Sequence, residues 1–337
     1  MTGRLPGGLW DGLLDDAATF PPGELPLGRA VRAHLAHELG PHGDLVGPLV
    51  VAQADLAALA ELTADLPTGS LPLTVTVPAP ENVALALDRA HAIGAVRLVG
   101  LEVAVPDGIA AEDVVPALDA ALGGAGIPAS AGIPTLPDGC NGQEAQETVG
   151  KSGPRGVGRR NSRLDEETSS SNREFHRPAG ETPTVYVELP RDSRRSALIE
   201  ELAGTPYVAK LRTGGVRADL HPDEAELAAA IVAMVGAGVA FKATAGLHHA
   251  VRNTDPVTGF EQHGFLNLLV ATDAALRGAD AEVVAGWLAE RDDARLATRA
   301  GNLDPRVREA FRSFGTCSID EPVAELAALG LLGEVVR

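Results

Sequence analysis

The chain has few cysteines and few aromatic residues. Its 337 residues include only two cysteines, Cys140 and Cys317, which cannot form the disulfide framework typical of small secreted domains. Phe, Trp and Tyr together make up 3% of the chain, so the core must consist largely of Ala, Val, Leu and Ile. Hydrophobic residues still reach 45%, which is typical of a globular protein and excludes a fully disordered chain.

Basic residues are also in short supply. The chain has 28 Lys and Arg against 46 Asp and Glu, which gives a formal net charge of −18. Surfaces that bind nucleic acid or anionic membranes need a surplus of Lys and Arg, so we expect neither partner. No apolar run approaches the roughly 20 residues that span a bilayer, and the N-terminus lacks a signal-peptide pattern. We therefore expect a cytoplasmic protein whose partner is a small anionic metabolite.

Residues 141–181 contain almost no hydrophobic side chains. Six of these 41 residues are hydrophobic, and seven basic residues balance seven acidic ones. So few apolar groups cannot offset a backbone ordering cost of about 1–2 kcal/mol per residue. We predict a disordered insertion within a single domain that spans residues 1–337.

Outside this segment, short β-branched runs alternate with Ala- and Leu-rich stretches of helical period. The expected strands are residues 12–17, 49–54, 71–77, 96–105, 184–189, 207–215, 239–246 and 314–319. This alternation is typical of βαβ units and a parallel sheet. Eight such strands predict a (β/α)8 barrel. The alternative is an open, doubly wound α/β sheet, which the lack of a G-x-G-x-x-G after any strand disfavours.

Two lysines stand inside otherwise apolar strands. Lys210 and Lys242 lie near the carboxyl ends of neighbouring expected strands, where the active sites of such barrels are found. Burial and a second cation both lower the pKa of a lysine and give the neutral amine that attacks a carbonyl. We expect the two lysines to do this for each other. The alternative is a structural pairing of one lysine with Glu102 or Glu188.

Other polar residues and glycines mark the same strand ends. Arg212 and Arg252 can hold a carboxylate or phosphate, or form salt bridges. Glycine turns leave backbone N–H groups free to bind a phosphate. Further strand-end candidates are Asp15, Asp16, Gln53 and Cys317. The expected substrate-binding residues are Arg212, Gly214, Gly215, Thr244, Gly246, Arg252, Asn267 and Ser318.

The densest polar cluster lies in residues 247–267, in the loop expected to cover the barrel mouth. His248, His249 and His263 offer acid–base groups near neutral pH, or metal ligands. No H-E-x-x-H or H-x-H motif occurs, so we expect catalytic histidines without a metal or other cofactor. His263 and Asn267 are spaced i, i+4, which predicts that they share one face of a helix.

Three short motifs resemble those of a known family. They are KLRTGG (210–215), KATAGLHH (242–249) and FGTCS (314–318), and they resemble the last strand ends of class I aldolases related to deoxyribose-phosphate aldolase. The resemblance implies a Schiff-base lysine at Lys210, a second lysine at Lys242 that lowers its pKa, and an acidic residue at Glu102. Lys242 stands in the better K-x-T-x-G match, so the two lysine roles can be exchanged.

We therefore expect an aldolase-type lyase that acts on a small anionic carbonyl compound through a lysine imine. Lys210 or Lys242 is the nucleophile, Glu102 and a histidine move protons, and Arg212 or Arg252 holds the anion.

Two alternatives stay open. One is a metal-dependent hydrolase that uses the three histidines with Asp15, Glu102 or Glu261. The other is a non-enzymatic barrel that binds an anionic metabolite. Oligomeric state is undecided at this stage, and a homo-oligomer is compatible with the sequence.

Overall fold

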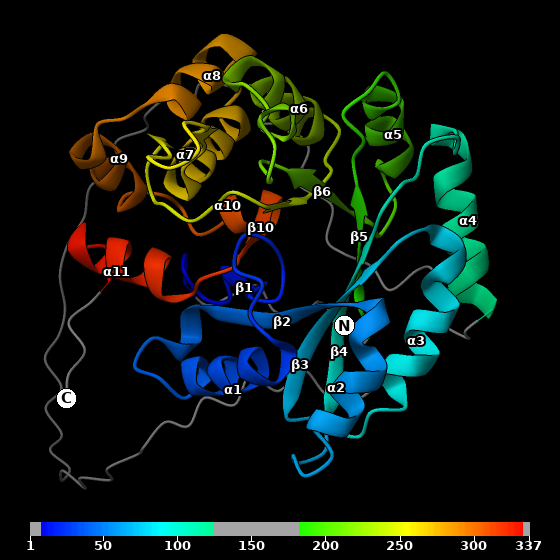
Figure 1. The fold of residues 1–337 in the computed structure, drawn as a ribbon. Coiled ribbons are helices and arrows are strands. Elements are labelled where there is room, and N and C mark those ends of the chain that lie inside the picture. Colours follow the sequence, from blue (N-terminus) through cyan, green and yellow to red (C-terminus); the bar gives the residue numbers. More distant parts are fainter. Residues whose placement is uncertain (1–7, 125–181, 333–337) are drawn as a thin grey trace, which may run out of the picture. The chain divides into compact units, whose positions relative to one another are not determined.

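The computed structural model describes residues 8–124 and 182–332, all of which belong to one compact unit (Figure 1). The predicted insertion at 141–181 lies outside these described residues.

Eight parallel strands close into a barrel in the order β1-β10-β7-β6-β5-β4-β3-β2 (Figure 1). The strands are β1 (Leu14–Asp16), β2 (Val46–Ala52), β3 (Leu71–Val77), β4 (Val96–Val103), β5 (Thr184–Glu188), β6 (Val208–Arg212), β7 (Phe241–Thr244) and β10 (Phe311–Thr316). The prediction of a (β/α)8 barrel is confirmed. The open-sheet alternative is wrong, because β1 pairs with both β2 and β10 and so closes the sheet.

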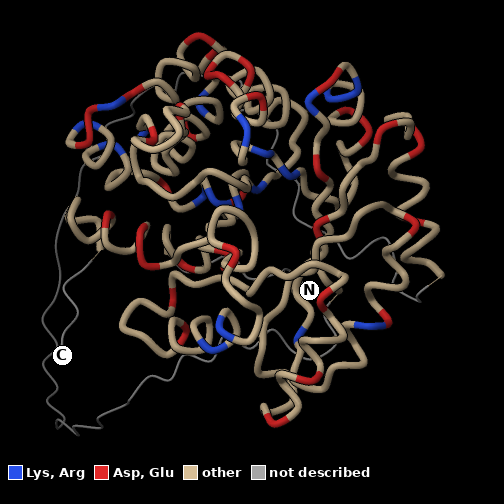
Figure 2. The backbone as a smooth tube through the Cα atoms, viewed as in Figure 1, with Lys and Arg blue, Asp and Glu red and all other residues tan. Residues whose placement is uncertain are grey.

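Helices connect the strands on the outside of the barrel. They are α1 (Leu27–Glu38), α2 (Leu56–Leu62), α3 (Val83–His91), α4 (Ala111–Gly124), α5 (Arg195–Leu202), α6 (Glu224–Gly236), α7 (Phe265–Leu276), α8 (Ala281–Ala289), α9 (Asp293–Ala300), α10 (Val307–Ala310) and α11 (Asp320–Ala328). Acidic residues are spread along these helices and their connecting turns (Figure 2). No helix in the described ranges is long and apolar enough to cross a membrane.

The long stretch between β7 and β10 holds additional elements. A short hairpin of β8 (Asn253–Thr254) and β9 (Glu261–Gln262) precedes α7, and α8, α9 and α10 follow it. Asp280 and Asp292 begin α8 and α9 as N-caps, accepting hydrogen bonds from the N–H groups of Val283 and Arg295. These elements explain why β10 lies so far along the chain from β7.

Alternation along the strands separates the barrel interior from the layer beneath the helices. Phe241 on β7 and Phe314 on β10 belong to the hydrophobic core, where their rings stack on Phe311 and Phe265 at 5.2 and 4.9 Å between centroids. Lys242, next to Phe241, points the other way. It contacts side chains on β1 and β4, neither of which is a neighbour of β7, so it reaches across the barrel interior.

Candidate active site

A cavity of about 670 Å³ opens at the carboxyl ends of the strands. This is the end of the barrel at which (β/α)8 enzymes place their active sites. The residues named from the sequence that line the cavity are Gln53, Glu102, Glu188, Lys210, Arg212, Gly215, Thr244, Gly246, His248 and Cys317. Gly214, Lys242, His249, Arg252, His263, Asn267 and Ser318 do not line it.

Five charged side chains form a connected group at the base of the cavity, which we call the ion cage: Asp15, Glu102, Glu188, Lys210 and Lys242. Glu102 lies at its centre. Its Oε2 is 2.8 Å from Lys210 Nζ and its Oε1 is 2.5 Å from Lys242 Nζ. Lys210 Nζ also lies 2.9 Å from Glu188 Oε2, and Lys242 Nζ lies 2.5 Å from Asp15 Oδ2. Each lysine is therefore held between two carboxylates, and one carboxylate joins both lysines.

Strand register brings these residues together. Lys210 is the direct partner of Lys242 across β6 and β7, and of Glu188 across β5 and β6. Directly paired residues on neighbouring parallel strands point to the same face of a sheet, which here is the barrel interior. Small residues leave room for the buried polar groups. A Cβ atom at Gly47 would lie 2.3 Å from Asp15 Oδ1, so that position on β2 requires glycine.

The two lysines differ in their access to the cavity. Lys242 is fully buried, with an exposed fraction of 0%, whereas Lys210 is 6% exposed and lines the cavity. Below the cavity wall, the Lys242 ammonium faces the Tyr186 ring at 4.8 Å from its centroid. The Ser313 hydroxyl donates to Asp15 Oδ2 at 2.7 Å. A ligand in the cavity therefore meets Lys210, while Lys242 lies beneath the cavity floor.

The prediction that the lysines lower each other's pKa is wrong for this arrangement. Burial alone would lower the pKa of Lys210, but the charges of Glu102 and Glu188 outweigh it and raise that pKa. In the same way, Asp15 and Glu102 raise the pKa of Lys242 against the effect of burial. Burial favours the neutral form of Glu102, yet the two ammonium groups lower its pKa to about 2. At neutral pH both lysines are charged and Glu102 is a carboxylate.

Asp15 differs from Glu102 in this respect. Burial raises its pKa, and the attraction of Lys242 offsets this only in part. Lys242 Nζ is shared between Asp15 and Glu102, so it does not neutralise Asp15 alone.

Arg212 connects the ion cage to the cavity. Its Nε donates to Glu188 Oε1 at 3.2 Å, and the side chain is partly exposed where it lines the cavity. A guanidinium group in this position suits an anionic group on a ligand.

The glycine turns after β6 and β7 have a steric role. A Cβ atom at Gly214 would lie 3.0 Å from Gly246 Cα, and Gly246 has a φ of 75°, which favours glycine. The two loops therefore touch through glycines. Gly215 and Gly246 line the cavity beside this contact.

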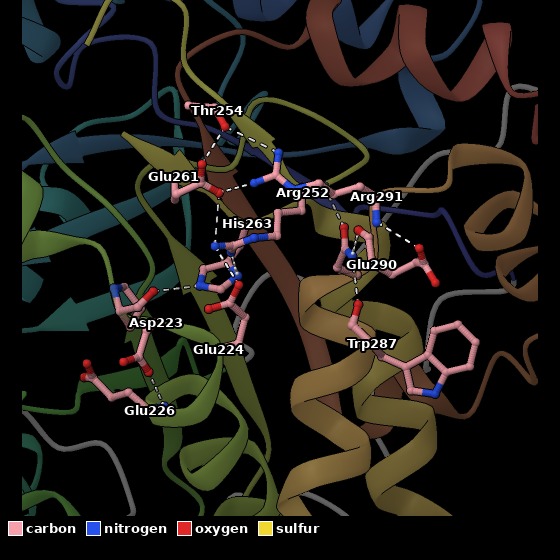
Figure 3. A network of polar contacts seen from close by, with 12 residues as sticks. Asp223, Glu224, Glu226, Arg252, Thr254, Glu261, His263, Trp287, Glu290 and Arg291 are labelled. Atoms are coloured by element: carbon pink, nitrogen blue, oxygen red, sulfur yellow. Dashed lines mark hydrogen bonds and ion pairs between the residues drawn. The ribbon is translucent and has the colours of Figure 1, made fainter. Parts of the chain in front are cut away.

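Most of the polar cluster at 247–267 forms a separate group, which we call the Arg252 network (Figure 3): Arg252, Glu224, Glu261, His263 and Asn267. Arg252 Nη2 lies 2.6 Å from Glu224 Oε1 and 3.2 Å from Glu261 Oε2. His263 Nε2 bonds the Pro222 carbonyl at 2.8 Å, which leaves Nδ1 to accept from Arg252 Nη1 at 3.3 Å. Asn267 Oδ1 accepts from the Arg252 backbone N–H at 2.8 Å.

The Arg252 network fixes the β8–β9 hairpin to α6 and to the end of α8. Asn267 Nδ2 donates to the carbonyl groups of Trp287 and Glu290, both at 2.8 Å. None of the network residues lines the cavity, so the structure does not place Arg252, His263 or Asn267 in the candidate active site. The predicted shared helix face of His263 and Asn267 is also wrong, because α7 begins only after Gly264.

The two remaining histidines have different positions. His249 Nδ1 lies 2.6 Å from Glu325 Oε1, on the side of α11 and away from the cavity. His248 lines the cavity, with Nδ1 3.1 Å from Glu321 Oε2 and Nε2 3.6 Å from Cys317 Sγ. Burial raises the pKa of Cys317 to about 11, so it is a neutral thiol. His248 is thus the histidine from the predicted set that a cavity ligand can reach.

The sequence did not show that the two neighbouring acids of β1, Asp15 and Asp16, point to opposite faces of the strand. Asp15 points into the ion cage, whereas Asp16 turns outward and bonds the buried His34 of α1 at 3.1 Å. Alternation along the strand distinguishes them once its register is known. Ser313 and Tyr186 were missed altogether, because their role at the base of the cage depends on contacts across the barrel. At the end of β10, Gly315 and Cys317 line the cavity, whereas the Ser318 hydroxyl accepts a hydrogen bond from the Glu321 backbone N–H at 3.4 Å.

Within residues 8–124 and 182–332, no group of three or more His, Cys, Asp or Glu side chains is arranged to hold a metal ion. The residues named for a metal-dependent hydrolase are divided between the ion cage, the Arg252 network and the α11 side. No protein-family model matches the chain, and no curated protein sequence matches it.

Proposed function

We propose that the protein is an enzyme of the lyase class that acts on a carbonyl compound through a Schiff base on Lys210. The observation that supports this most is the position of Lys210. Of the two lysines in the described ranges, it is the one that lines the cavity, and its Nζ lies 2.8 and 2.9 Å from two carboxylates that can accept its proton. The resemblance of KLRTGG (210–215) to the strand end of class I aldolases points to the same residue.

The reaction begins with loss of a proton from Lys210. Glu188 is the acceptor at the cavity surface. Lys210 and, to a smaller extent, Arg212 lower the pKa of Glu188, and binding of a substrate anion by Arg212 would weaken the second of these effects. The free amine adds to the carbonyl carbon. The resulting carbinolamine oxygen takes up a proton and leaves as water, which gives an iminium ion. His248 is the other group at the cavity that can move this proton.

Glu102 and Glu188 also stabilise the iminium ion once it has formed. The iminium carries the positive charge that the Lys210 ammonium held, and it forms in the same place, beside Glu102 and Glu188. Fixed charges that match a developing charge lower a reaction barrier without reorganising. When a carbon–carbon bond of the substrate breaks, its electron pair moves into the iminium and neutralises the nitrogen as an enamine. The hydroxyl group on the departing carbon loses its proton to Glu188 or His248, so that this fragment leaves as a carbonyl compound. This chemistry needs no metal or organic cofactor, and we keep the cytoplasm as its expected compartment.

Borohydride trapping tests the proposal directly. We would incubate the protein with acetaldehyde, pyruvate or glyceraldehyde 3-phosphate, reduce with borohydride, and map the adduct by mass spectrometry. The chain has only three lysines, Lys151, Lys210 and Lys242, so the modified site is unambiguous. We expect an adduct on Lys210 that persists in Lys151→Arg and disappears in Lys210→Arg. An adduct only on another amine, or on none across the panel, would overturn the proposal.

A further inference from the structure

The cavity has two chemically different sides. Four of the charged lining residues, Glu102, Glu188, Lys210 and Arg212, come from the adjacent strands β4, β5 and β6. Arg89, on α3, also lines the cavity. On the side formed by the adjacent strands β1, β2 and β3 and the loop after β1, no charged residue of these strands lines the cavity, because Asp15 and Asp16 of β1 lie outside its lining. We call its hydrophobic members the apolar side: Phe20, Pro21, Val50, Ala52, Val77 and Pro78.

The volume is large for a two- or three-carbon carbonyl compound. Ligand cavities of about 300–1,000 Å³ generally take ligands of drug-like size, and this cavity, at about 670 Å³, lies in the middle of that range. A carbonyl carbon bonded to Lys210 occupies only the base of the charged side. The apolar side would then stay in contact with water if the substrate ended there.

The rim of the cavity also has apolar surface that a small substrate would leave in contact with water. Val216, in the loop after β6, lines the cavity with 64% of its surface exposed, and the neighbouring Leu220 is half-buried. Exposed apolar surface at the mouth of a cavity is stabilised when a ligand removes it from water, at about 25 cal/mol per Å². The polar lining residues on the β1–β3 half include the neutral Gln53, Thr76 and Asn82 and one cation, Arg89, which lies on α3.

We propose that the substrate carries an apolar chain of several carbons, or a ring, beyond its carbonyl group. This part packs on the apolar side and under Val216, while the carbonyl carbon meets Lys210 and an anionic group faces Arg212. The inference rests on the proposed function for the position of the carbonyl carbon. It differs from the expectation of a small substrate, because it assigns the larger part of the cavity to hydrocarbon.

A homologous series tests the chain-length dependence. Acetaldehyde, butanal and hexanal would be trapped on Lys210 with borohydride, and the concentration for half-maximal adduct compared, with Nα-acetyl-lysine as the reference for intrinsic reactivity. Each fully buried methylene should lower that concentration about fourfold relative to the reference. If acetaldehyde is trapped but the half-maximal concentration stays constant along the series, the inference fails and the proposed function stands.

A second measurement does not depend on imine formation. Acetate, butyrate and hexanoate cannot form an imine, and their binding can be followed by titration calorimetry. We expect affinity to rise with chain length, and a flat series would overturn the inference even if no aldehyde is trapped. Phe20→Ser should flatten both series, because it removes an aromatic ring from the apolar side. Val216→Ser should weaken the gradient, whereas the matched control Val257→Ser, which is 91% exposed and not at the cavity, should leave it intact.

Discussion

The ion cage and the Arg252 network both hold a cation between carboxylates, but they differ in how far the carboxylates are shielded. Lys242 is fully buried, and the side chains of its partners Asp15 and Glu102 are 4% and 3% exposed. Arg252 is also buried, yet the side chains of Glu224 and Glu261 are 27% and 45% exposed. Removal of Lys242 would leave buried carboxylates in the ion cage, whereas removal of Arg252 would leave carboxylates in the Arg252 network that water can reach. The cage also borders a cavity, which the network does not.

Replacement of Lys242 with Met should have the largest effect on stability. It leaves Asp15 and Glu102 buried with one ammonium group fewer, and loss of one partner of a buried pair costs about 3–5 kcal/mol. Urea unfolding measures this loss. Adding Asp15→Asn to the variant should restore part of the stability, because it removes one of the uncompensated charges. A loss below about 1 kcal/mol for Lys242→Met alone would contradict the buried cage.

Acid should destabilise the protein through Glu102. Its folded pKa of about 2 lies below the ordinary value of 4.5, so its contribution is complete above pH 4.5 and is lost as pH falls towards 2. We expect the free energy of unfolding to fall over this range in the wild type and to fall less in Glu102→Gln. Urea unfolding from pH 7 to pH 2 follows the difference. The comparison is Glu261→Gln: the pKa of Glu261 is also lowered, first by its hydrogen bond to Thr254, but its side chain is 45% exposed, so this variant should reduce the slope less than Glu102→Gln.

Replacement of Arg252 with Met should cost less than replacement of Lys242. Glu224 and Glu261 are partly exposed and can be hydrated when the cation is lost, and Glu261 keeps its contact with Arg291. A hydrogen bond to a charged group contributes about 1.5–3 kcal/mol, and we expect a loss near the lower end of this range. Trapping of acetaldehyde on Lys210 should be unchanged in a folded variant. A tenfold lower adduct yield without a change in stability would show that the network acts on the site.

The barrel and the site were not equally predictable from the sequence. Apolar runs at regular intervals predicted all eight strands, because the strands of a parallel sheet are buried on both faces. Lys210, Lys242 and Glu102 were found for the same reason, as charges within such runs. The protonation states of these three residues could not be predicted from the sequence. They depend on Asp15 and Glu188, which reach Lys242 and Lys210 only after the barrel has closed. Of the three predicted histidines, His249 and His263 do not line the cavity. Side chains in a loop have no fixed periodicity, so the sequence does not show which of them face the cavity.

His249 provides the smallest effect and the opposite dependence on pH. Its hydrogen bond to Glu325 raises its pKa, and both side chains are partly exposed. A raised histidine pKa contributes stability below its unfolded value of about 6.5, and this contribution is lost as pH rises through the folded pKa. We expect His249→Gln to cost about 0–1 kcal/mol at pH 6 and nothing at pH 9, measured by urea unfolding. Adduct formation on Lys210 should be unchanged at both pH values, because the His249–Glu325 pair lies outside the cavity. A variant that unfolds like the wild type but no longer forms the adduct would instead place His249 with His248 at the active site.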